Sequence, residues 1–184
     1  MHLIIACCLC ILLLQPVMCQ AEPLTMHYGV NDVDMNGDGV DDIIVKSRWE
    51  NGNAHSFDRY LALINCKDEL CREGVYEVPL GLMEKGSFVT SEGAGCASES
   101  PNGLSQLTDY TFEKDENGLL VITKYARDFG ENYSSKMPVT ITSYKFSDAL
   151  KEGEMSIGLP RFYFKEVSKR TTEDKYCNVR DLIR

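Results

Sequence analysis

The sequence predicts a mainly β protein, a single antiparallel β-sandwich or curved-sheet domain with long loops and two disulfides. Segments rich in Val, Ile, Thr and Tyr alternate apolar with polar residues, as strands with one buried face do. Clusters of Gly, Asn, Asp and Pro separate these segments and mark turns. No apolar pattern of helical period lasts for three turns, and no internal repeat is visible.

Two hairpins are the clearest elements. The expected strands, in chain order, are residues 43–49, 55–64, 74–80, 87–90, 107–112, 119–125, 139–146 and 161–167. Asn51-Gly52 joins the first two, and this dipeptide favours a type I′ turn because both of its residues need a positive φ. A turn over residues 115–118 joins the fifth and sixth strands. We expect a loop at 91–103, which is small and polar, and a short helical turn in the tail after Thr171.

The first 21 residues predict a signal peptide. They contain no Lys, Arg, Asp or Glu, and residues 3–14 form a continuous apolar run that ends at Gln15 and Pro16. This run is too short to span a bilayer as a helix, but it fits the apolar region of an export signal. We therefore expect residues 22–184 to form one β-rich domain that is periplasmic or secreted, without stable membrane insertion after cleavage.

The net charge of −9 limits the partners that this domain can have. All of that charge falls on residues 22–184, because the leader carries none. A chain this acidic repels phosphate, so nucleic acid and anionic lipid are poor partners. The acidity is consistent with solubility outside the cytoplasm and with binding of cations.

Four of the eight cysteines remain after the leader, namely Cys66, Cys71, Cys96 and Cys177. In an exported domain, four cysteines suggest two disulfides. Cys66 and Cys71 are close enough in sequence to close a small loop, which leaves Cys96 to pair with Cys177. The long second bridge would contribute about 4 kcal/mol through chain entropy. A zinc site is the alternative, but the sequence has no CxxC motif after the leader and only two histidines there.

Oxygen-bearing side chains recur at every second position of an acidic loop, which predicts a calcium site. The expected ligands are the side chains of Asp34, Asn36, Asp38 and Asp42 and the carbonyl of Val40. A chain that curls around a hard cation presents alternate side chains inward, and glycine permits the curl. An EF-hand is disfavoured, because Ile43 stands at its twelfth position in place of Glu and a strand-like run follows where a helix should begin. The alternative is a polar turn rich in Asn, Asp and Gly that holds no metal.

Hydrolase signatures are absent, so we expect no enzymatic activity. His55 and Asp58 flank Ser56 in an expected strand, where alternate side chains point to opposite faces and therefore cannot form one triad. The sequence has no GxSxG motif and no Ser followed three residues later by Lys. His55 is interpreted first as a hydrogen-bonding residue that anchors the hairpin, and second as a contact to a ligand.

Arg127 is a candidate for binding a carboxylate, because guanidinium offers two parallel donors. Its neighbour Asp128 either helps to bind a ligand or satisfies a turn. His55, Asp58, Arg127 and Asp128 together form the tentative ligand-binding set. Aromatic residues are numerous enough to line a pocket, although most aromatic side chains of this kind belong to the core.

Several segments in the same order resemble the CarG-like family of carbapenem intrinsic resistance, or self-resistance, proteins. The segments that carry the resemblance are the acidic loop that leads into residues 43–45, followed by residues 50–58, 93–96, 127–130, 138–142 and 176–179. No single segment is specific to the family, but together the segments span nearly all of the mature chain, and their order and spacing carry the resemblance. This chain differs from the family pattern in having the additional pair Cys66 and Cys71.

The resemblance implies a small periplasmic protein that protects its producer from a carbapenem without being a known β-lactamase. On this basis we expect it to bind the antibiotic or to protect the antibiotic's target, with Arg127 as a candidate for the carbapenem carboxylate and calcium ordering the first hairpin. An alternative is a secreted β-rich module that binds a protein, such as an inhibitor of a cell-envelope enzyme. The possible partners are therefore a carbapenem or an envelope protein.

Overall fold

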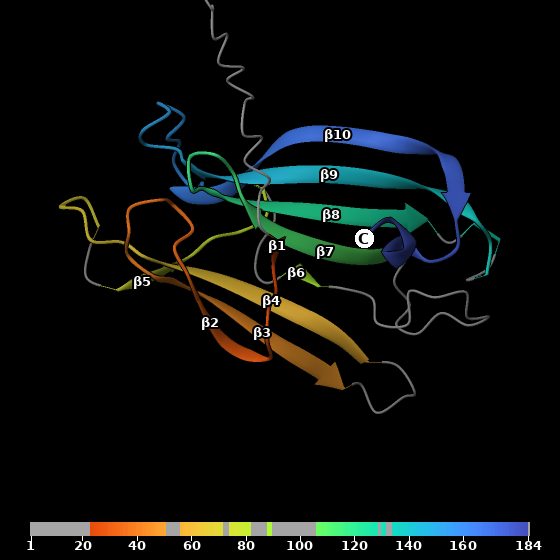
Figure 1. Cartoon of the computed structure of the whole chain (residues 1–184). Coiled ribbons are helices and arrows are strands. Elements are labelled where there is room, and N and C mark those ends of the chain that lie inside the picture. The colour runs from red at the N-terminus through yellow and green to blue at the C-terminus, as the bar shows by residue number, and fades with distance from the viewer. Residues whose placement is uncertain are drawn as a thin grey trace, which may run out of the picture.

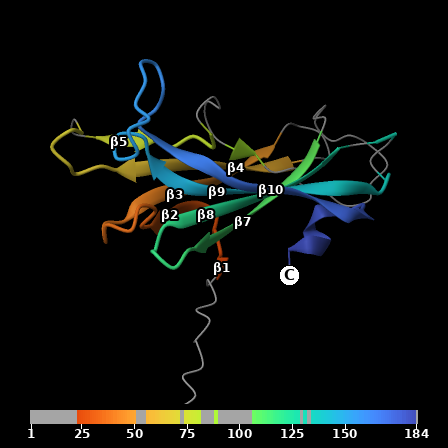
Figure 2. The same ribbon diagram turned by 90° about the horizontal axis from the view of Figure 1, so that it is seen from above.

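Two antiparallel sheets pack face to face in this computed structural model, which describes residues 23–50, 56–71, 74–81, 88–89, 106–128, 130–131 and 134–183. Figures 1 and 2 show the two layers from the side and from above. The mainly β prediction is thus confirmed. The expected leader, residues 1–21, lies outside the described residues. Within them, no helix is long and apolar enough to cross a membrane.

The N-terminal sheet has the strand order β2-β3-β4-β5, with β6 paired to β4. Its strands are β2 (Gly29–Val33), β3 (Asp42–Glu50), β4 (Ser56–Asn65), β5 (Val75–Glu77) and β6 (Phe88–Val89). β3 and β4 pair from Ile43 opposite Leu63 to Glu50 opposite Ser56. The first predicted hairpin is therefore confirmed, although its turn residues lie outside the described residues.

The C-terminal sheet has the strand order β1-β7-β8-β9-β10. Its strands are β1 (Pro23–Leu24), β7 (Gln106–Lys114), β8 (Leu120–Asp128), β9 (Met137–Asp148) and β10 (Phe162–Tyr176). The hairpin of β7 and β8 turns at Gly118, whose φ of 76° only glycine adopts readily. Asp115 stabilises this turn because its Oδ1 accepts the backbone N–H groups of Asn117 and Leu119, each at 2.9 Å.

β10 is longer than the sequence predicts. It continues to Tyr176, whereas the apolar alternation ends near Val167, because pairing with β9 carries on across two register shifts. Beyond β10, the 3-10 helix η1 (Val179–Leu182) is the short helical turn expected in the tail. Its residue Val179 packs with Leu107 of β7 on the outer face of the C-terminal sheet.

One apolar core lies between the sheets. Its large side chains come from both layers, including Ile44, Tyr60, Ala62 and Ile64 from one sheet and Tyr110, Phe112, Ile122, Tyr144, Phe146, Phe162 and Phe164 from the other. The ring of Tyr60 in β4 lies 5.1 Å from that of Phe112 in β7 and stacks on Phe88 at 5.5 Å. Alternation of inward apolar residues along each strand produces this core.

Backbone hydrogen bonds also join the two sheets at Phe164. Its N–H donates to the carbonyl of Pro79 at 2.9 Å, and its carbonyl accepts the N–H of Gly81 at 2.9 Å. Residues 79–81 follow β5 of the N-terminal sheet, whereas Phe164 belongs to β10 of the other. The two layers are therefore connected by main-chain bonds as well as by apolar contacts.

The short disulfide is confirmed, with Cys66 and Cys71 bonded and their Cα atoms 6.0 Å apart. Cys177 is buried at the end of β10, but its predicted partner Cys96 lies outside the described residues. The second disulfide therefore stays a prediction.

Candidate functional site

A cleft of about 350 Å³ opens where β1, β3, β4 and β7 approach η1. This volume lies at the lower end of the range of about 300–1,000 Å³ that is typical of small-molecule sites. The polar and aromatic residues that matter here are Lys46, Asp58, Tyr60, Asp109, Tyr110 and Arg180, and we refer to the site as the paired-charge cleft.

Strand alternation explains why charged residues enter this cleft. In β4, Asp58 and Tyr60 continue the inward-facing series that includes the buried Ala62. In β3, Lys46 follows the buried Ile44 by two residues and lies opposite Tyr60. The inward face thus changes from apolar to charged toward one end of the hairpin, which places polar groups beside the aromatic core.

The first charge pair joins Lys46 to Asp58. Lys46 Nζ lies 3.1 Å from Asp58 Oδ2, and the hydroxyl of Tyr28 donates to Asp58 Oδ1 at 2.9 Å. Lys46 Nζ also lies 4.7 Å from the centre of the Tyr28 ring, within the range of cation–π attraction. Asp58 is only 9% exposed, so these partners offset the cost of burying its charge.

The second charge pair joins the C-terminal helix to β7. Arg180 Nε donates to Asp109 Oδ2 at 2.6 Å. The helix that carries Arg180 begins at the N-cap residue Asn178, whose Oδ1 accepts the backbone N–H of Arg180 at 3.0 Å. The cap therefore fixes the position from which Arg180 reaches Asp109.

Tyr60 lies between the two charge pairs. Burial raises the pKa of its hydroxyl above the usual value, and the nearby carboxylates of Asp58 and Asp109 raise it further. The hydroxyl consequently stays protonated at physiological pH and can donate a hydrogen bond. The cleft combines two cations, two carboxylates and a neutral donor on an aromatic wall.

Arg127 lies outside this cleft but supports the segment beside it. The side chain is 1% exposed, with Nε donating to the carbonyl of Cys177 at 2.6 Å and Nη1 to that of Asp128 at 3.1 Å. Cys177 immediately precedes the cap Asn178, so Arg127 holds the chain that leads into η1. Its predicted contact with a carboxylate stays a prediction.

The other tentative residues are separated in the structure. Asp58 lines the cleft, Asp128 is exposed at the end of β8, and His55 lies outside the described residues. Sequence reasoning missed Lys46, Asp109 and Arg180, whereas Tyr60 and Tyr110 were among the aromatic residues considered as pocket lining. Charged residues at inward positions of β3 and β4 were a usable signal for Lys46, whereas nothing in the local sequence connects Arg180 with Asp109.

The acidic loop before β3 is organised by hydrogen bonds from its own backbone. Asp34 accepts the N–H of Gly37 through Oδ1 at 2.8 Å and that of Gly39 through Oδ2 at 3.0 Å. Asp38 Oδ1 accepts the N–H of Val40 at 2.7 Å, and its Oδ2 accepts from the amide of Asn36 at 2.9 Å. These are the bonds expected for the polar-turn alternative.

Asp42 points into the protein and connects the acidic loop with the end of β4. Its side chain accepts the N–H groups of Met35 at 2.9 Å and Asn65 at 2.8 Å, and it is 1% exposed. Burial raises the pKa of its carboxyl, although the two backbone N–H donors act to lower it. Among the described residues, the group of His, Cys, Asp or Glu side chains that come within 4.8 Å of one another is Cys66, Asp68 and Cys71, outside this loop, and its two sulfur atoms are already joined in a disulfide. Calcium binding stays a prediction.

Comparisons with known proteins agree with this architecture. A family model described as "Carbapenem resistance protein CarG-like" matches residues 26–184. A crystal structure of CarG is similar to this chain with a TM-score of 0.68 and 20% identical residues, and the likeness covers 88% of this chain and 93% of that one. At such identity the likeness establishes the fold alone. No curated protein matches the sequence.

Proposed function

This chain belongs to the CarG-like family of carbapenem resistance proteins, and we propose from that premise that it is exported and protects the cell by binding a carbapenem. The paired-charge cleft is the proposed binding site. Binding takes place without hydrolysis of the antibiotic, in keeping with a sequence that lacks the serine hydrolase and β-lactamase signatures.

The observation that carries this proposal is the combination of cations and aromatic rings in the cleft. A carbapenem is a small bicyclic molecule with one carboxylate and one lactam carbonyl. Lys46 and Arg180 supply cations for the carboxylate, and the protonated hydroxyl of Tyr60 supplies a donor for a carbonyl. The rings of Tyr60 and Tyr110, 6.2 Å apart between centroids, form an apolar wall for the bicycle.

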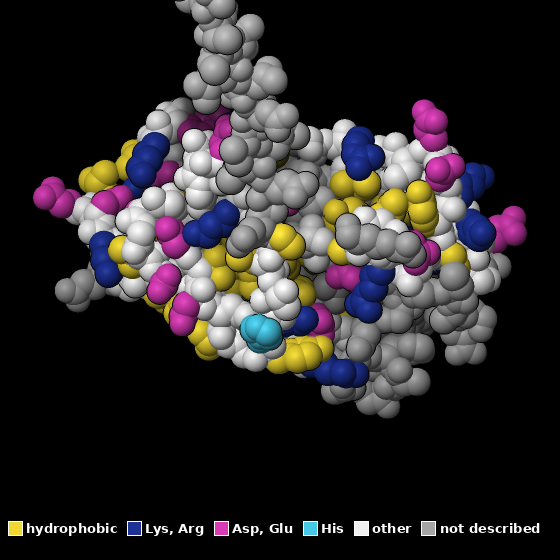
Figure 3. Space-filling view, in the orientation of Figure 1, with side chains coloured by type: hydrophobic (Ala, Val, Ile, Leu, Met, Phe, Trp, Pro, Cys, Tyr) yellow, Lys and Arg dark blue, Asp and Glu magenta, His cyan; other side chains and the backbone are white. Residues whose placement is uncertain are grey.

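Charge balance supports the choice of this cleft for an anion. The charges of two cations and two carboxylates cancel within the cleft, although the whole chain carries a net charge of −9. On the face in Figure 3, side chains of both signs are interspersed among apolar ones. A monoanion therefore meets less repulsion at the cleft than the net charge of the protein suggests.

Titration calorimetry with a carbapenem tests the proposal directly. We expect a saturable heat with the unmodified protein, and a loss of affinity of at least about tenfold in Lys46→Met and in Arg180→Gln, because each removes a charge-assisted contact. Lys169→Met removes an exposed lysine of β10 outside the cleft and serves as the matched control. Mass spectrometry of the recovered antibiotic should show an intact ring.

Two results would contradict the proposal. One is an absence of heat at high micromolar protein, with or without calcium. The other is equal affinity in the cleft variants and in the control, which would place the ligand elsewhere. Circular dichroism of each variant establishes that it is folded, and Arg180→Gln is the safer variant because half of the Arg180 side chain is exposed.

We also propose that calcium binds the acidic loop. Four of the five expected ligands, the side chains of Asp34, Asn36 and Asp38 and the carbonyl of Val40, supply the oxygen atoms that this ion prefers. The fifth, Asp42, already accepts the N–H groups of Met35 and Asn65. Binding would replace some of the bonds that their side chains now make to backbone N–H groups. The resulting order would be transmitted to β3, because the loop leads directly into that strand.

A further inference from the structure

Two ion pairs line the paired-charge cleft and lie close to one aromatic ring. Lys46 of β3 pairs with Asp58 of β4. Arg180 of η1 pairs with Asp109 of β7. Both carboxylates raise the pKa of the Tyr60 hydroxyl, so both lie near the same ring. A ligand in this cleft of about 350 Å³ therefore meets two cations and two carboxylates within one space.

The pair of Arg180 and Asp109 is the one that a ligand can open more readily. Half of the Arg180 side chain is exposed, and its helix η1 lies against β7 (Figure 1). The Lys46 side chain is only 17% exposed, and its ammonium also lies 4.7 Å from the centre of the Tyr28 ring. A ligand carboxylate can thus replace Asp109 on Arg180 through a turn of an exposed side chain, whereas Lys46 is held more firmly.

Opening of this pair by an anion has a cost at Asp109. The Asp109 side chain is only 13% exposed. Its other donor in the described part of the chain is the backbone N–H of Tyr110, at 2.8 Å from Oδ1. A nearly buried carboxylate that loses its cation is strongly unfavourable. A ligand that carries only a carboxylate therefore gains one ion pair at the expense of another.

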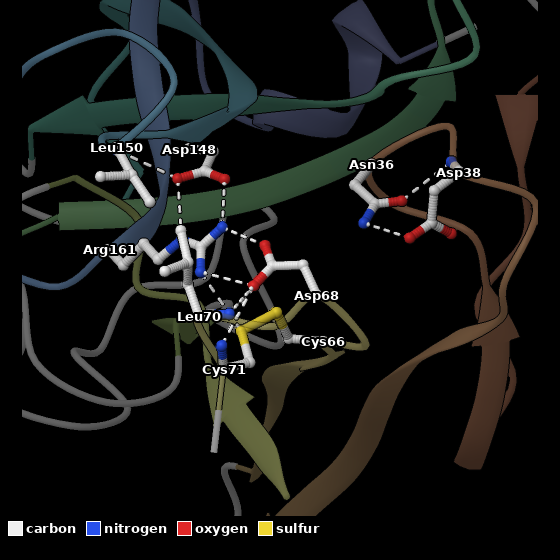
Figure 4. Close-up of polar contacts among 9 residues, drawn as sticks. All are labelled: Asn36, Asp38, Cys66, Asp68, Leu70, Cys71, Asp148, Leu150 and Arg161. Atoms are coloured by element: carbon white, nitrogen blue, oxygen red, sulfur yellow. Dashed lines mark hydrogen bonds and ion pairs between the residues drawn. A yellow bond between two sulfur atoms is a disulfide. The ribbon is translucent and has the colours of Figure 1, made fainter. Parts of the chain in front are cut away.

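The charges at the other large cavity are arranged differently (Figure 4). This cavity of about 500 Å³ shares no lining residue with the paired-charge cleft, and Asp68 and Asp148 line it. Arg161 donates to both carboxylates at once, through Nη1 to Asp68 at 3.1 Å and through Nε to Asp148 at 3.0 Å. Its side chain is only 15% exposed. Arg161 is therefore used to bridge two carboxylates of the protein, and an incoming anion would have to break that bridge.

We propose that the paired-charge cleft selects ligands that carry an ammonium group as well as a carboxylate. The ligand carboxylate binds Arg180 and the ligand ammonium binds Asp109, so each charge of the opened pair has a new partner. Such a ligand bears no net charge, which suits a cleft whose own charges cancel. This inference rests on the proposed function and narrows it to carbapenems with an amine in the side chain.

Titration calorimetry with a matched pair of ligands tests the inference. One ligand is a carbapenem whose side chain ends in a primary amine. The other is its N-acetyl derivative, which keeps the bicycle and the carboxylate but has no positive charge. The unmodified protein should bind the amine at least about tenfold more tightly, because this ligand alone gives Asp109 a new cation. In Asp109→Asn the two affinities should agree within about twofold, since no carboxylate is left unpaired.

The matched control is Asp174→Asn, which removes an exposed carboxylate of β10 outside the cleft and should keep the preference. Asparagine has the shape of aspartate and can still accept the N–H of Tyr110, so Asp109→Asn should fold, as circular dichroism would show. Equal affinity of both ligands for the unmodified protein overturns the inference and leaves the proposed function intact. A preference that persists in Asp109→Asn, or that is lost in Asp174→Asn as well, also overturns it. Binding of neither ligand overturns the proposed function and this inference together.

Discussion

Replacement of Arg161 by methionine should destabilise the protein, because it leaves the Asp148 carboxylate without its main cation. The Asp148 side chain is only 5% exposed and accepts two hydrogen bonds from Arg161, at 3.0 and 2.9 Å. Removing one partner of a buried ion pair costs about 3–5 kcal/mol. Since the Arg161 side chain is 15% exposed and water can partly solvate the site, we expect a smaller loss, of about 2–3 kcal/mol.

Methionine is the chosen replacement because it keeps most of the packing of Arg161 on the ring of Phe162, where the guanidinium carbon lies 4.6 Å from the centroid. For a domain of this size, the loss corresponds to a fall in melting temperature of about 4–12 °C. Urea unfolding under non-reducing conditions, followed by circular dichroism, measures the free energy of unfolding.

Asp68→Asn provides the comparison, because Asp68 is bonded to the same guanidinium but lies on the exposed side of the bridge. Its effect should be small, since exposed ion pairs contribute little. The reasoning is refuted if Arg161→Met unfolds like the unmodified protein, or if Asp68→Asn costs as much as Arg161→Met. The first result would mean that the buried carboxylate does not depend on Arg161, and the second that the exposed ion pair contributes as much as the buried one.

Three further outcomes are expected. Replacing Cys66 and Cys71 by serine should lower the free energy of unfolding by about 2 kcal/mol, because the bridge closes a short loop; an unchanged urea midpoint would contradict this. If calcium binds the acidic loop, millimolar Ca²⁺ should raise the melting temperature relative to EDTA, and Asp38→Asn should abolish the increase; identical melting curves would rule the ion out. Acid should destabilise the fold between about pH 4 and pH 2, because folding lowers the pKa values of Asp68 and Asp148. The stability that these two carboxylates contribute is present above their unfolded pKa of 3.8 and is lost as the pH falls through their folded pKa values. The raised pKa of Asp42 acts in the opposite direction, but the pKa values of Asp115, Glu152 and Glu154 are also lowered, so the net effect of acid is a loss of stability. Urea midpoints that stay constant from about pH 6 to pH 2 would refute this prediction.

The hairpins were predictable because their signals are local. Gly118 and the alternation on either side of it specify both the turn and the register of β7 with β8. The second half of β10 was not predictable in this way. Residues 165–175 are mostly charged or polar and exposed, so they lack the apolar alternation of a strand, and their extended form depends on pairing with β9.

The site was predictable only in part for a related reason. Asp58 was identified from the sequence, and the inward register of β4 brings it into the cleft. Arg180 and Asp109 are 71 residues apart, and only the complete fold brings them together. Arg127 shows the converse difficulty, because a carboxylate-binding arginine and a buried arginine that binds main-chain carbonyls look the same in sequence.

The main-chain bonds at Phe164 bear on how this protein can be divided. A fragment that stops before β10 would lose both bonds to residues 79–81 and three core aromatic residues, Phe162, Tyr163 and Phe164. The first sheet would then lose the part of its apolar cover that β10 supplies, although β7, β8 and β9 would remain. Neither half of the chain is therefore an independent building block, and a stable shortened version would have to retain β10 while shortening the loops.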